Sequence, residues 1–346
     1  MTTDDVTIGK YEYYEALFDP LWVDPNAQHR RKANHVPKKV RSQIVSDLAD
    51  DTSDVDLGFE TTYRPSRHEA GWLLSSLYSF YDEGLITDVL ALVKGGKEAS
   101  VYRCEANPTV GAHLLAAKVY RPRMFRNLRN DRMYRQGREI LLEGGGPAGR
   151  DSGYIERAIR NKTPFGLQAA HTSWLMYEFT AIERLYEAGA AVPRPIAPSP
   201  NAILMSYHGD ERMAAPTLNT VNLEPEEAQR LFQEVLRNMD LMLQHDLVHG
   251  DLSAYNILYW LPEDGPSEIT LIDFPQIINL HTNHNAHFIL RRDIQRVCEY
   301  FAGQRVACDP AAIMDEFWTR YVEQPDPEDL RADWSRLEAA LAEAAE

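Results

Sequence analysis

Residues 249–256 read H-G-D-L-S-A-Y-N, and a second carboxylate follows at Asp273. An apolar, helix-compatible run precedes this stretch, and two short apolar runs separated by a Pro-Asp-Gly turn follow it. The pattern predicts a polar loop that carries Asp251 and Asn256, and then a β-hairpin that ends at Asp273. Phosphoryl transfer uses these groups, because one carboxylate can orient an attacking hydroxyl while an amide oxygen and a second carboxylate hold Mg²⁺.

A simpler interpretation is a polar loop in which the two Asx side chains only cap turns. A lone H-G-D tripeptide is weak evidence against it. The combination of Asp251, Asn256 five residues later, and an apolar-Asp-Phe sequence after a hairpin is much more specific. The combination therefore favours a phosphotransfer site.

Composition sets broad limits on the protein. The chain has 346 residues, enough for two lobes, and a formal charge of −16, which argues against general coating of nucleic acid. Its three cysteines, Cys104, Cys298 and Cys308, form no C-x-x-C motif, so a disulfide framework or zinc site is not expected. The first residues lack a secretory pattern and no apolar run approaches membrane-spanning length, so we expect a cytoplasmic protein without a membrane partner.

The first 60 residues contain a basic block (29–41) and an acidic block (47–60). They are interpreted either as a charged, partly disordered arm or as a tail that binds a partner. A helix is predicted for residues 66–84, because Ser66 and Glu69 form a capping-box pattern and Gly84 occupies the expected terminating position.

Three antiparallel strands are predicted next, at about residues 89–93, 101–104 and 114–120. The loop K-G-G-K-E-A-S between the first two can bring backbone close to a phosphate, although paired glycines usually only close hairpins. Lys118 lies within the apolar third strand, where a lysine is costly unless it is paired or reaches solvent at a sheet edge. Glu178, among apolar residues of a helix predicted for 173–188, is the best candidate to pair with it.

Arginines recur at intervals of three between residues 121 and 138. They are interpreted either as a solvated insertion or as a cationic face that meets phosphate, RNA or an acidic partner. Further on, a Pro-rich connector (192–200) leads to a strand at 202–205, and residues 206–210 resemble a hinge whose backbone could contact a nucleotide base.

The last part of the chain is predicted to be mainly helical, with helices at 224–245, from 285 to 301, at 310–324 and at 327–345. Arg292 and Asp293 lie among apolar residues of the second of these helices and are candidates to contact the 249–256 loop. Three histidines nearby, His281, His284 and His287, invite a metal site, but capping or packing is preferred because no carboxylates accompany them at set spacing.

The chain resembles the RIO family of atypical serine/threonine protein kinases over about residues 86–302. The resemblance rests on K-G-G-K-E-A-S-V-Y (94–102), A-A-K-V-Y (116–120), the helix with Y-E-F (177–179), L-V-H-G-D-L-S-A-Y-N-I-L (247–258) and L-I-D-F-P-Q (271–276). It implies a two-lobed protein-kinase-like α+β fold that lacks an activation loop and carries an N-terminal helical extension. The implied domains are an extension (1–85), an N-lobe (86–206) with an Arg-rich insertion (121–170), and a C-lobe (207–346).

The resemblance also implies roles for individual residues. Asp251 would be the catalytic aspartate, Lys118 would hold the phosphates and Glu178 would orient Lys118. Asn256 and Asp273 would bind Mg²⁺, with Mn²⁺ as an alternative ion. ATP would be covered by the Gly-containing loop and held at the hinge, by residues Gly95, Gly96, Lys97, Ser100, Val101, Met205, Ser206, Tyr207 and His208.

Family members phosphorylate their own serines, some act as ATPases through a phosphorylated metal-binding Asp, and some serve small-subunit ribosome maturation. The implied activity is thus an ATP-dependent serine/threonine kinase, an ATPase, or both, with autophosphorylation and with RNA or a ribosomal partner at the Arg-rich insertion. Ser206 departs from the family, where an acidic hinge residue is common. The alternatives are a small-molecule kinase of the aminoglycoside or choline type and a slow, nucleotide-gated binding module.

Overall fold

The computed structural model describes Phe59 and residues 61–96, 98–120, 133–134, 136–138, 140–142, 145–146, 148, 152–161, 163–262 and 265–323. The chain divides into two units, Met1–Asp54 and Val55–Glu346, and all described residues belong to the second. The charged blocks before residue 59, Lys97, most of the arginine repeat and the helix predicted for 327–345 lie outside the described residues.

Helix α3 (Arg67–Asp82) confirms the predicted capped helix. The Ser66 backbone N–H donates to the Glu69 carboxylate at 3.3 Å, and Gly84 adopts a left-handed φ of 66° just after the helix. Leu73, Leu77 and Phe80 are fully buried against the neighbouring sheet. The helix therefore packs against the first lobe, as its apolar face predicts.

The sheet has five antiparallel strands in the order β1-β2-β3-β5-β4. Four of them were predicted from the sequence: β1 (Ile86–Gly95), β2 (Ala99–Ala106), β3 (Leu114–Tyr120) and β5 (Ala202–Ser206). The connector predicted for 192–200 is wrong in part, because Pro195–Pro198 forms the fifth strand, β4. Its prolines are tolerated because β4 lies at the edge of the sheet, where one side of the strand needs no ladder hydrogen bonds.

The two faces of strand β3 pack against different apolar layers, because its side chains alternate between the faces. Leu115, Ala117 and Val119 pack with α3 on one face. Ala116 and Tyr120 pack on the other face with residues of helix α6 (Pro164–Glu187). Successive strand side chains point to opposite faces, so Lys118 lies on the α6 side.

Helix α6 begins nine residues before the predicted start at residue 173. The Thr163 hydroxyl accepts a hydrogen bond from the Gly166 N–H at 3.0 Å and caps the helix, and proline occupies its first turn. A preceding helix, α5 (Ser152–Arg160), approaches so closely that a Cβ on Gly166 would lie 2.1 Å from the Ala158 carbonyl. The segment 121–170 therefore contains a helical hairpin, which the glycines and proline obscured in the sequence.

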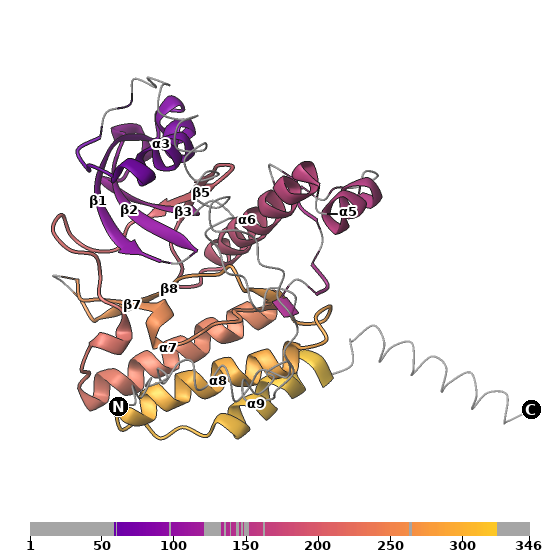
Figure 1. Cartoon of the computed structure of the whole chain (residues 1–346). Helices are drawn as coiled ribbons and strands as arrows, with labels where there is room; N and C mark the ends of the chain where they lie inside the picture. Colours follow the sequence, from indigo (N-terminus) through magenta and orange to yellow (C-terminus); the bar gives the residue numbers. More distant parts are fainter. Residues whose placement is uncertain are drawn as a thin grey trace, which may run out of the picture. The chain divides into compact units, whose positions relative to one another are not determined.

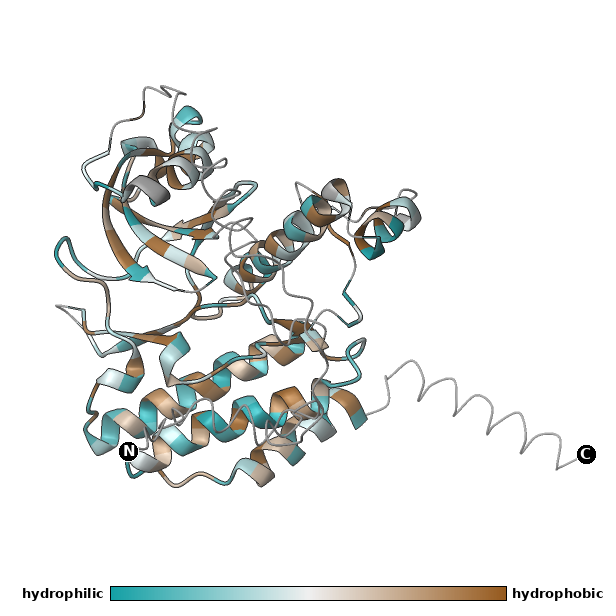
Figure 2. Ribbon diagram, in the orientation of Figure 1, coloured by the Kyte–Doolittle hydropathy of each residue, from teal (hydrophilic) through white to brown (hydrophobic). Residues whose placement is uncertain are grey.

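The rest of the described chain is mainly helical (Figure 1). Its long helices are α7 (Pro225–Gln244), α8 (Ala286–Gly303) and α9 (Pro310–Trp318). The first two match the predictions, whereas α9 gives way to a π-helical turn, Thr319–Glu323. Apolar and polar stretches alternate along these helices, in keeping with one buried and one solvated face (Figure 2).

Two short strand pairs frame the 249–256 loop. Strand β6 (Leu247–Val248) pairs with β9 (Ile278–Asn279), and β7 (Ile257–Trp260) pairs with β8 (Glu268–Leu271). The predicted hairpin after the loop is therefore confirmed. Among the described residues, no helix is both long and apolar enough to cross a membrane.

Candidate active site

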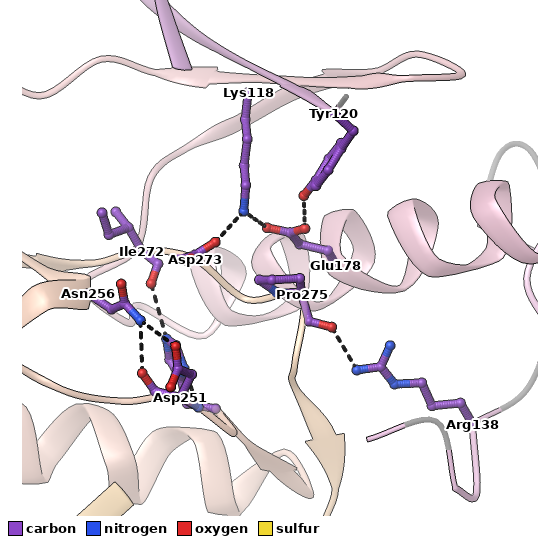
Figure 3. A network of polar contacts seen from close by, with 10 residues as sticks. Lys118, Tyr120, Arg138, Glu178, Asp251, Asn256, Ile272, Asp273 and Pro275 are labelled. Carbon is purple, nitrogen blue, oxygen red and sulfur yellow. Dashed lines mark hydrogen bonds and ion pairs between the residues drawn. The ribbon is translucent and has the colours of Figure 1, made fainter. Parts of the chain in front are cut away.

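Lys118 lies at the centre of a polar cluster between the sheet and the C-terminal region (Figure 3). Its Nζ is 2.7 Å from Oε1 of Glu178 on α6 and 2.6 Å from Oδ1 of Asp273 after β8. The pairing of Lys118 with Glu178 that the sequence predicted is confirmed. Three segments that are far apart in the sequence therefore meet at one ammonium group.

The ion pairs of this cluster favour the charged forms of Lys118 and Asp273. Burial alone would lower the pKa of Lys118, but the carboxylates of Asp273 and Glu178 raise it well above its usual value. Partial burial would raise the pKa of Asp273, yet the adjacent ammonium outweighs it and the pKa lies below its usual value. Lys118 is therefore a cation at neutral pH, held by two carboxylates that share its charge.

Tyr120 completes the cluster, and the sequence analysis missed it. Its hydroxyl donates to Oε2 of Glu178, and its ring packs edge-on against Trp174. The signal was its position two residues after Lys118, which places both side chains on the same face of β3. Glu178 thus receives one donor on each carboxylate oxygen, which fixes its orientation toward Lys118.

Asp273 occupies an unusual backbone conformation directly after the hairpin. Its φ is 74°, in the left-handed region that Asp tolerates better than most side chains. The carbonyl of the preceding residue, Ile272, accepts a hydrogen bond from the His249 ring at 3.2 Å, and the Ile272 N–H donates to the Asn256 carbonyl at 2.9 Å. These bonds tie the Asp273 segment to the 249–256 loop.

Within that loop, Asn256 and Asp251 contact each other. Nδ2 of Asn256 donates to the Asp251 carbonyl at 2.9 Å and to its Oδ2 at 3.1 Å. Because the amide nitrogen faces Asp251, the amide oxygen points to the other side (Figure 3). Gly250 is required here, since its φ is 84° and a Cβ would lie 2.2 Å from the Gln276 carbonyl.

Helix α8 is hydrogen-bonded to the same loop. Oδ2 of Asp293 accepts a hydrogen bond from the Gly250 N–H at 2.8 Å, and Arg292 donates to the Gly250 carbonyl. The predicted contact of these two residues with the loop is confirmed. Arg296 was not predicted, and its Nη1 lies 2.7 Å from Oδ1 of Asp251. Its signal was the helical spacing that places it on the same face as Arg292 and Asp293.

The Gly-containing loop joins β1 to β2 beside Lys118. Gly96 donates to the Ala99 carbonyl at 2.9 Å, and a Cβ on Gly96 would lie 2.6 Å from that oxygen, so the tight turn needs glycine. In the strand ladders Gly95 pairs with Ser100, and Val101 pairs with Lys118. Of the predicted phosphate-covering residues, Val101 is thus the ladder neighbour of Lys118. Ser100 pairs with Val119, whose side chain packs on the opposite face of β3 from Lys118, and Lys97 lies outside the described residues.

The predicted hinge follows β5. Met205 is buried and pairs with Ala116 in the ladder. The Ser206 N–H donates to the Arg194 carbonyl at 2.8 Å, and the His208 carbonyl accepts from the Ala215 N–H at 2.9 Å. These two backbone groups are already hydrogen-bonded within the chain. They are therefore less available to hydrogen-bond a nucleotide base at Ser206, Tyr207 and His208. Burial lowers the pKa of His208, so its ring is neutral at pH 7.

Arg138 is the described arginine of the 121–138 repeat, and it contacts the Asp273 segment. Its guanidinium donates to the Pro275 carbonyl at 3.0 Å and to the Ile277 carbonyl, and it lies 4.5 Å over the Tyr177 ring. Tyr177 precedes Glu178 on α6, so Arg138 joins the segment after Asp273 to the helix that carries Glu178. This arginine is engaged inside the fold rather than displayed on a cationic face.

Two of the three histidines make contacts that need no metal. The His281 ring lies 3.1 Å from Asp246, and His287 packs edge-on against Trp318. Among the described residues, no group of three His, Cys, Asp or Glu side chains is arranged to hold a metal. Mg²⁺ at a phosphotransfer site needs fewer protein ligands, because one or two side-chain oxygens and the substrate phosphates suffice. The Asp273 carboxylate and the Asn256 amide oxygen, on segments that are hydrogen-bonded to each other, fit that ion.

An antiparallel sheet with a Glu-paired lysine, followed by a helical region with an Asp-x₄-Asn loop and a hairpin-borne Asp, defines a protein-kinase-like phosphotransferase. A model of the family described as RIO domain matches residues 150–313. The RIO-type serine/threonine-protein kinase Rio1 of Haloferax volcanii is 30% identical over 244 residues, which cover 70% of this chain and 72% of that protein. The chain belongs to the RIO family of serine/threonine-protein kinases, as the sequence predicted.

Other similar proteins agree with this assignment. The human serine/threonine-protein kinase RIO1 is 28% identical over 247 residues, covering 70% of this chain but 38% of its own length. The fission yeast rio1 kinase is covered over 42% of its length, so this chain spans less than half of either eukaryotic relative. A crystal structure of the Rio2 kinase from Chaetomium thermophilum has a TM-score of 0.51 at 21% identity, covering 82% of this chain and 76% of that one. The predicted kinase-like α+β fold is therefore confirmed.

Proposed function

We propose that this chain transfers the γ-phosphoryl group of ATP to a serine or threonine hydroxyl with the help of Mg²⁺. The observation that carries the proposal is the pairing of buried Lys118 with both Glu178 and Asp273. The two carboxylates hold the ammonium in one place, where phosphates accompanied by Mg²⁺ would replace Asp273 as its partner. The Asp251–Asn256 loop is tied to the same hairpin as Asp273, and it supplies the remaining groups.

The proposed binding roles follow from position. Lys118 holds the phosphates and Glu178, fixed by Tyr120, keeps Lys118 in place. The loop residues proposed to cover the phosphates are Gly95, Gly96, Lys97, Ser100 and Val101. Met205 lies behind the adenine, and Ser206, Tyr207 and His208 form the hinge beside it.

The proposed metal ligands are Asn256 and Asp273. Bound Mg²⁺ would supply positive charge that offsets the charge developing on the phosphates, and Mn²⁺, which also accepts oxygen ligands, is the alternative ion. Oδ1 of Asp273 lies 2.6 Å from Nζ of Lys118. Asp273 would therefore leave Lys118 to the phosphates and hold the metal when both are bound.

The proposed chemical step is transfer of the γ-phosphoryl group from ATP to the acceptor hydroxyl. The acceptor hydroxyl oxygen forms a bond to the γ-phosphorus while the bond to the β–γ bridging oxygen breaks, and ADP leaves with the electron pair. Asp251 orients the hydroxyl and accepts its proton. Lys118 and the phosphate-covering loop stabilise charge on the transferring group.

A second candidate is an ATPase that proceeds through phosphorylated Asp273. It is favoured by the 43% exposure of the Asp273 side chain beside the phosphate-binding Lys118, and a structurally similar protein was solved as a Rio2 kinase-ADP/Mg²⁺-phosphoaspartate complex. A carboxylate oxygen would attack the γ-phosphorus with loss of ADP, and water would then hydrolyse the acyl phosphate. The two candidates differ in the group that carries the phosphate.

The proposed partners are ATP and a hydroxyl acceptor, which includes serines and threonines of the chain itself. RNA or a ribosomal partner is proposed at the 121–170 segment, where Arg157 and Arg160 are exposed on α5. A cytoplasmic location is proposed from the cysteine usage described above.

The test is incubation of the purified protein with γ-labelled ATP and Mg²⁺, followed by treatment with hydroxylamine, beside an Asp251→Ala control. Hydroxylamine cleaves acyl phosphates and leaves phosphate esters intact. Label that resists hydroxylamine and disappears in Asp251→Ala supports the kinase. Label that hydroxylamine releases supports the ATPase through Asp273, and the absence of both label and phosphate release contradicts both.

A further inference from the structure

Three charged residues on one face of α8 approach the loop that carries Asp251. Arg292 and Asp293 contact the loop backbone at Gly250. Arg296 lies three and four residues after them, on the same face of the helix. It contacts the side chain of Asp251 rather than the loop backbone. The helix therefore holds both the backbone of the loop and its catalytic carboxylate.

The contact between Arg296 and Asp251 is an ion pair that is mostly shielded from water. Nη1 of Arg296 is 2.7 Å from Oδ1 of Asp251, and the two side chains are only 9% and 19% exposed. The other carboxylate oxygen, Oδ2, accepts a hydrogen bond from Asn256 at 3.1 Å. Each oxygen of Asp251 thus has a protein donor, which restricts how the carboxylate can rotate.

Such a pair has a stronger effect than the same pair on a surface. Water and salt screen exposed charges, whereas a shielded guanidinium and carboxylate interact more strongly and in a more fixed geometry. The planar guanidinium, anchored on a helix, restricts the rotation of the Asp251 carboxylate. A carboxylate held in one orientation is suited to orient a hydroxyl for reaction.

We propose that Arg296 is a positioning residue for phosphoryl transfer, acting through the orientation of Asp251. The inference rests on the proposed function, in which Asp251 orients the acceptor hydroxyl. Arg296 contacts Asp251 rather than the Lys118 cluster, so its contribution falls on the chemical step and not on nucleotide binding. The opposite role, in which Arg296 blocks Asp251 and restrains the enzyme, predicts a change of the opposite sign.

The experiment compares the wild type with Arg296→Met, Arg296→Gln and Arg296→Lys, with Arg291→Met as the matched control on an exposed position of the same helix. For each folded protein, kcat and the KM for ATP are measured from transfer of the γ-phosphoryl label. We expect Arg296→Met and Arg296→Gln to lower kcat about 10- to 100-fold, the scale of lost orientation of a catalytic group, with the KM for ATP within about twofold. Arg296→Lys keeps the charge but not the planar geometry and recovers part of the loss.

A kcat of Arg296→Met or Arg296→Gln that equals or exceeds the wild-type value overturns the inference, and so does a rise in the KM for ATP that matches the fall in kcat/KM. If neither variant folds, Arg296→Lys decides: a fall in kcat at unchanged KM supports the inference, and an unchanged kcat overturns it. A wild type that transfers no phosphate contradicts the proposed function itself, whereas an active wild type with equally active Arg296 variants contradicts only the role of Arg296.

Discussion

The site consists of two regions that are assembled in different ways. The Lys118 cluster joins a strand, a helix and a hairpin that are 60 and 155 residues apart in the sequence. The Asp251 loop places its two main groups within five residues of each other and is supported by one helix, α8. The first region therefore depends on the packing of separate elements, whereas the second is organised locally.

This difference suggests a division of labour. In the proposed function the Lys118 cluster holds the phosphates, and Asp273 would pass from Lys118 to the metal. The Asp251 loop has fixed donors on both carboxylate oxygens, which suits a group that must keep one orientation during the reaction. Each of the following substitutions acts on one side of this division.

The largest effect is expected for Lys118→Ala. Loss of the ammonium removes the phosphate contact and leaves Glu178 buried without its counter-ion, so turnover should fall by about two or more orders of magnitude. Nucleotide affinity should fall as well, which a labelled-nucleotide binding assay measures. Arg291→Ala, at an exposed position of α8, is the control, and near-normal turnover of Lys118→Ala would contradict the assignment.

A smaller effect is expected for Asp273→Ala, in the Mg²⁺ dependence. Removal of a ligand should raise the Mg²⁺ concentration for half-maximal activity about tenfold or more. Titration of activity with Mg²⁺ at fixed ATP measures this shift, with Asp82→Ala, at an exposed position of α3, as the control. An unchanged Mg²⁺ midpoint would remove Asp273 from the metal site.

The smallest effect is expected for Arg138→Met, which releases the Pro275 and Ile277 carbonyls from the helix that carries Glu178. Asp273 would then be held less firmly, and kcat should fall about three- to tenfold, because small misplacements of reacting groups are costly. The matched control is Arg157→Met, at an exposed position of α5. Equal loss in both variants would show that general positive charge, rather than the contact of Arg138, is responsible.

The sequence predicted the site residues whose type and spacing are tied to the chemistry. Asp251, Asn256 and Asp273 follow from a loop and a hairpin, and Lys118 follows from the cost of a charge within an apolar strand. The Glu178 pairing could be predicted because few acidic residues lie among apolar neighbours in a helix. Tyr120, Arg138 and Arg296 were missed, since tyrosines and arginines are common and their partners are set only by tertiary packing.

Some elements of the fold could likewise not be predicted from the sequence. Short apolar runs were sufficient for four of the strands, and the capping box was sufficient for α3. Strand β4 and the first turns of α6 were missed because proline and glycine usually interrupt regular structure. In the folded chain the prolines lie on an edge strand and Gly166 permits close contact between α5 and α6.

The central claim is tested most directly by Asp251→Ala, in which ATP affinity and the rate of a single turnover are measured on the same preparation. The division of labour predicts that ATP affinity stays within about threefold of the wild type while the rate of phosphoryl transfer falls by about two or more orders of magnitude. A variant that transfers phosphate at a near-normal rate, or one that loses ATP binding as severely as Lys118→Ala does, would contradict the claim.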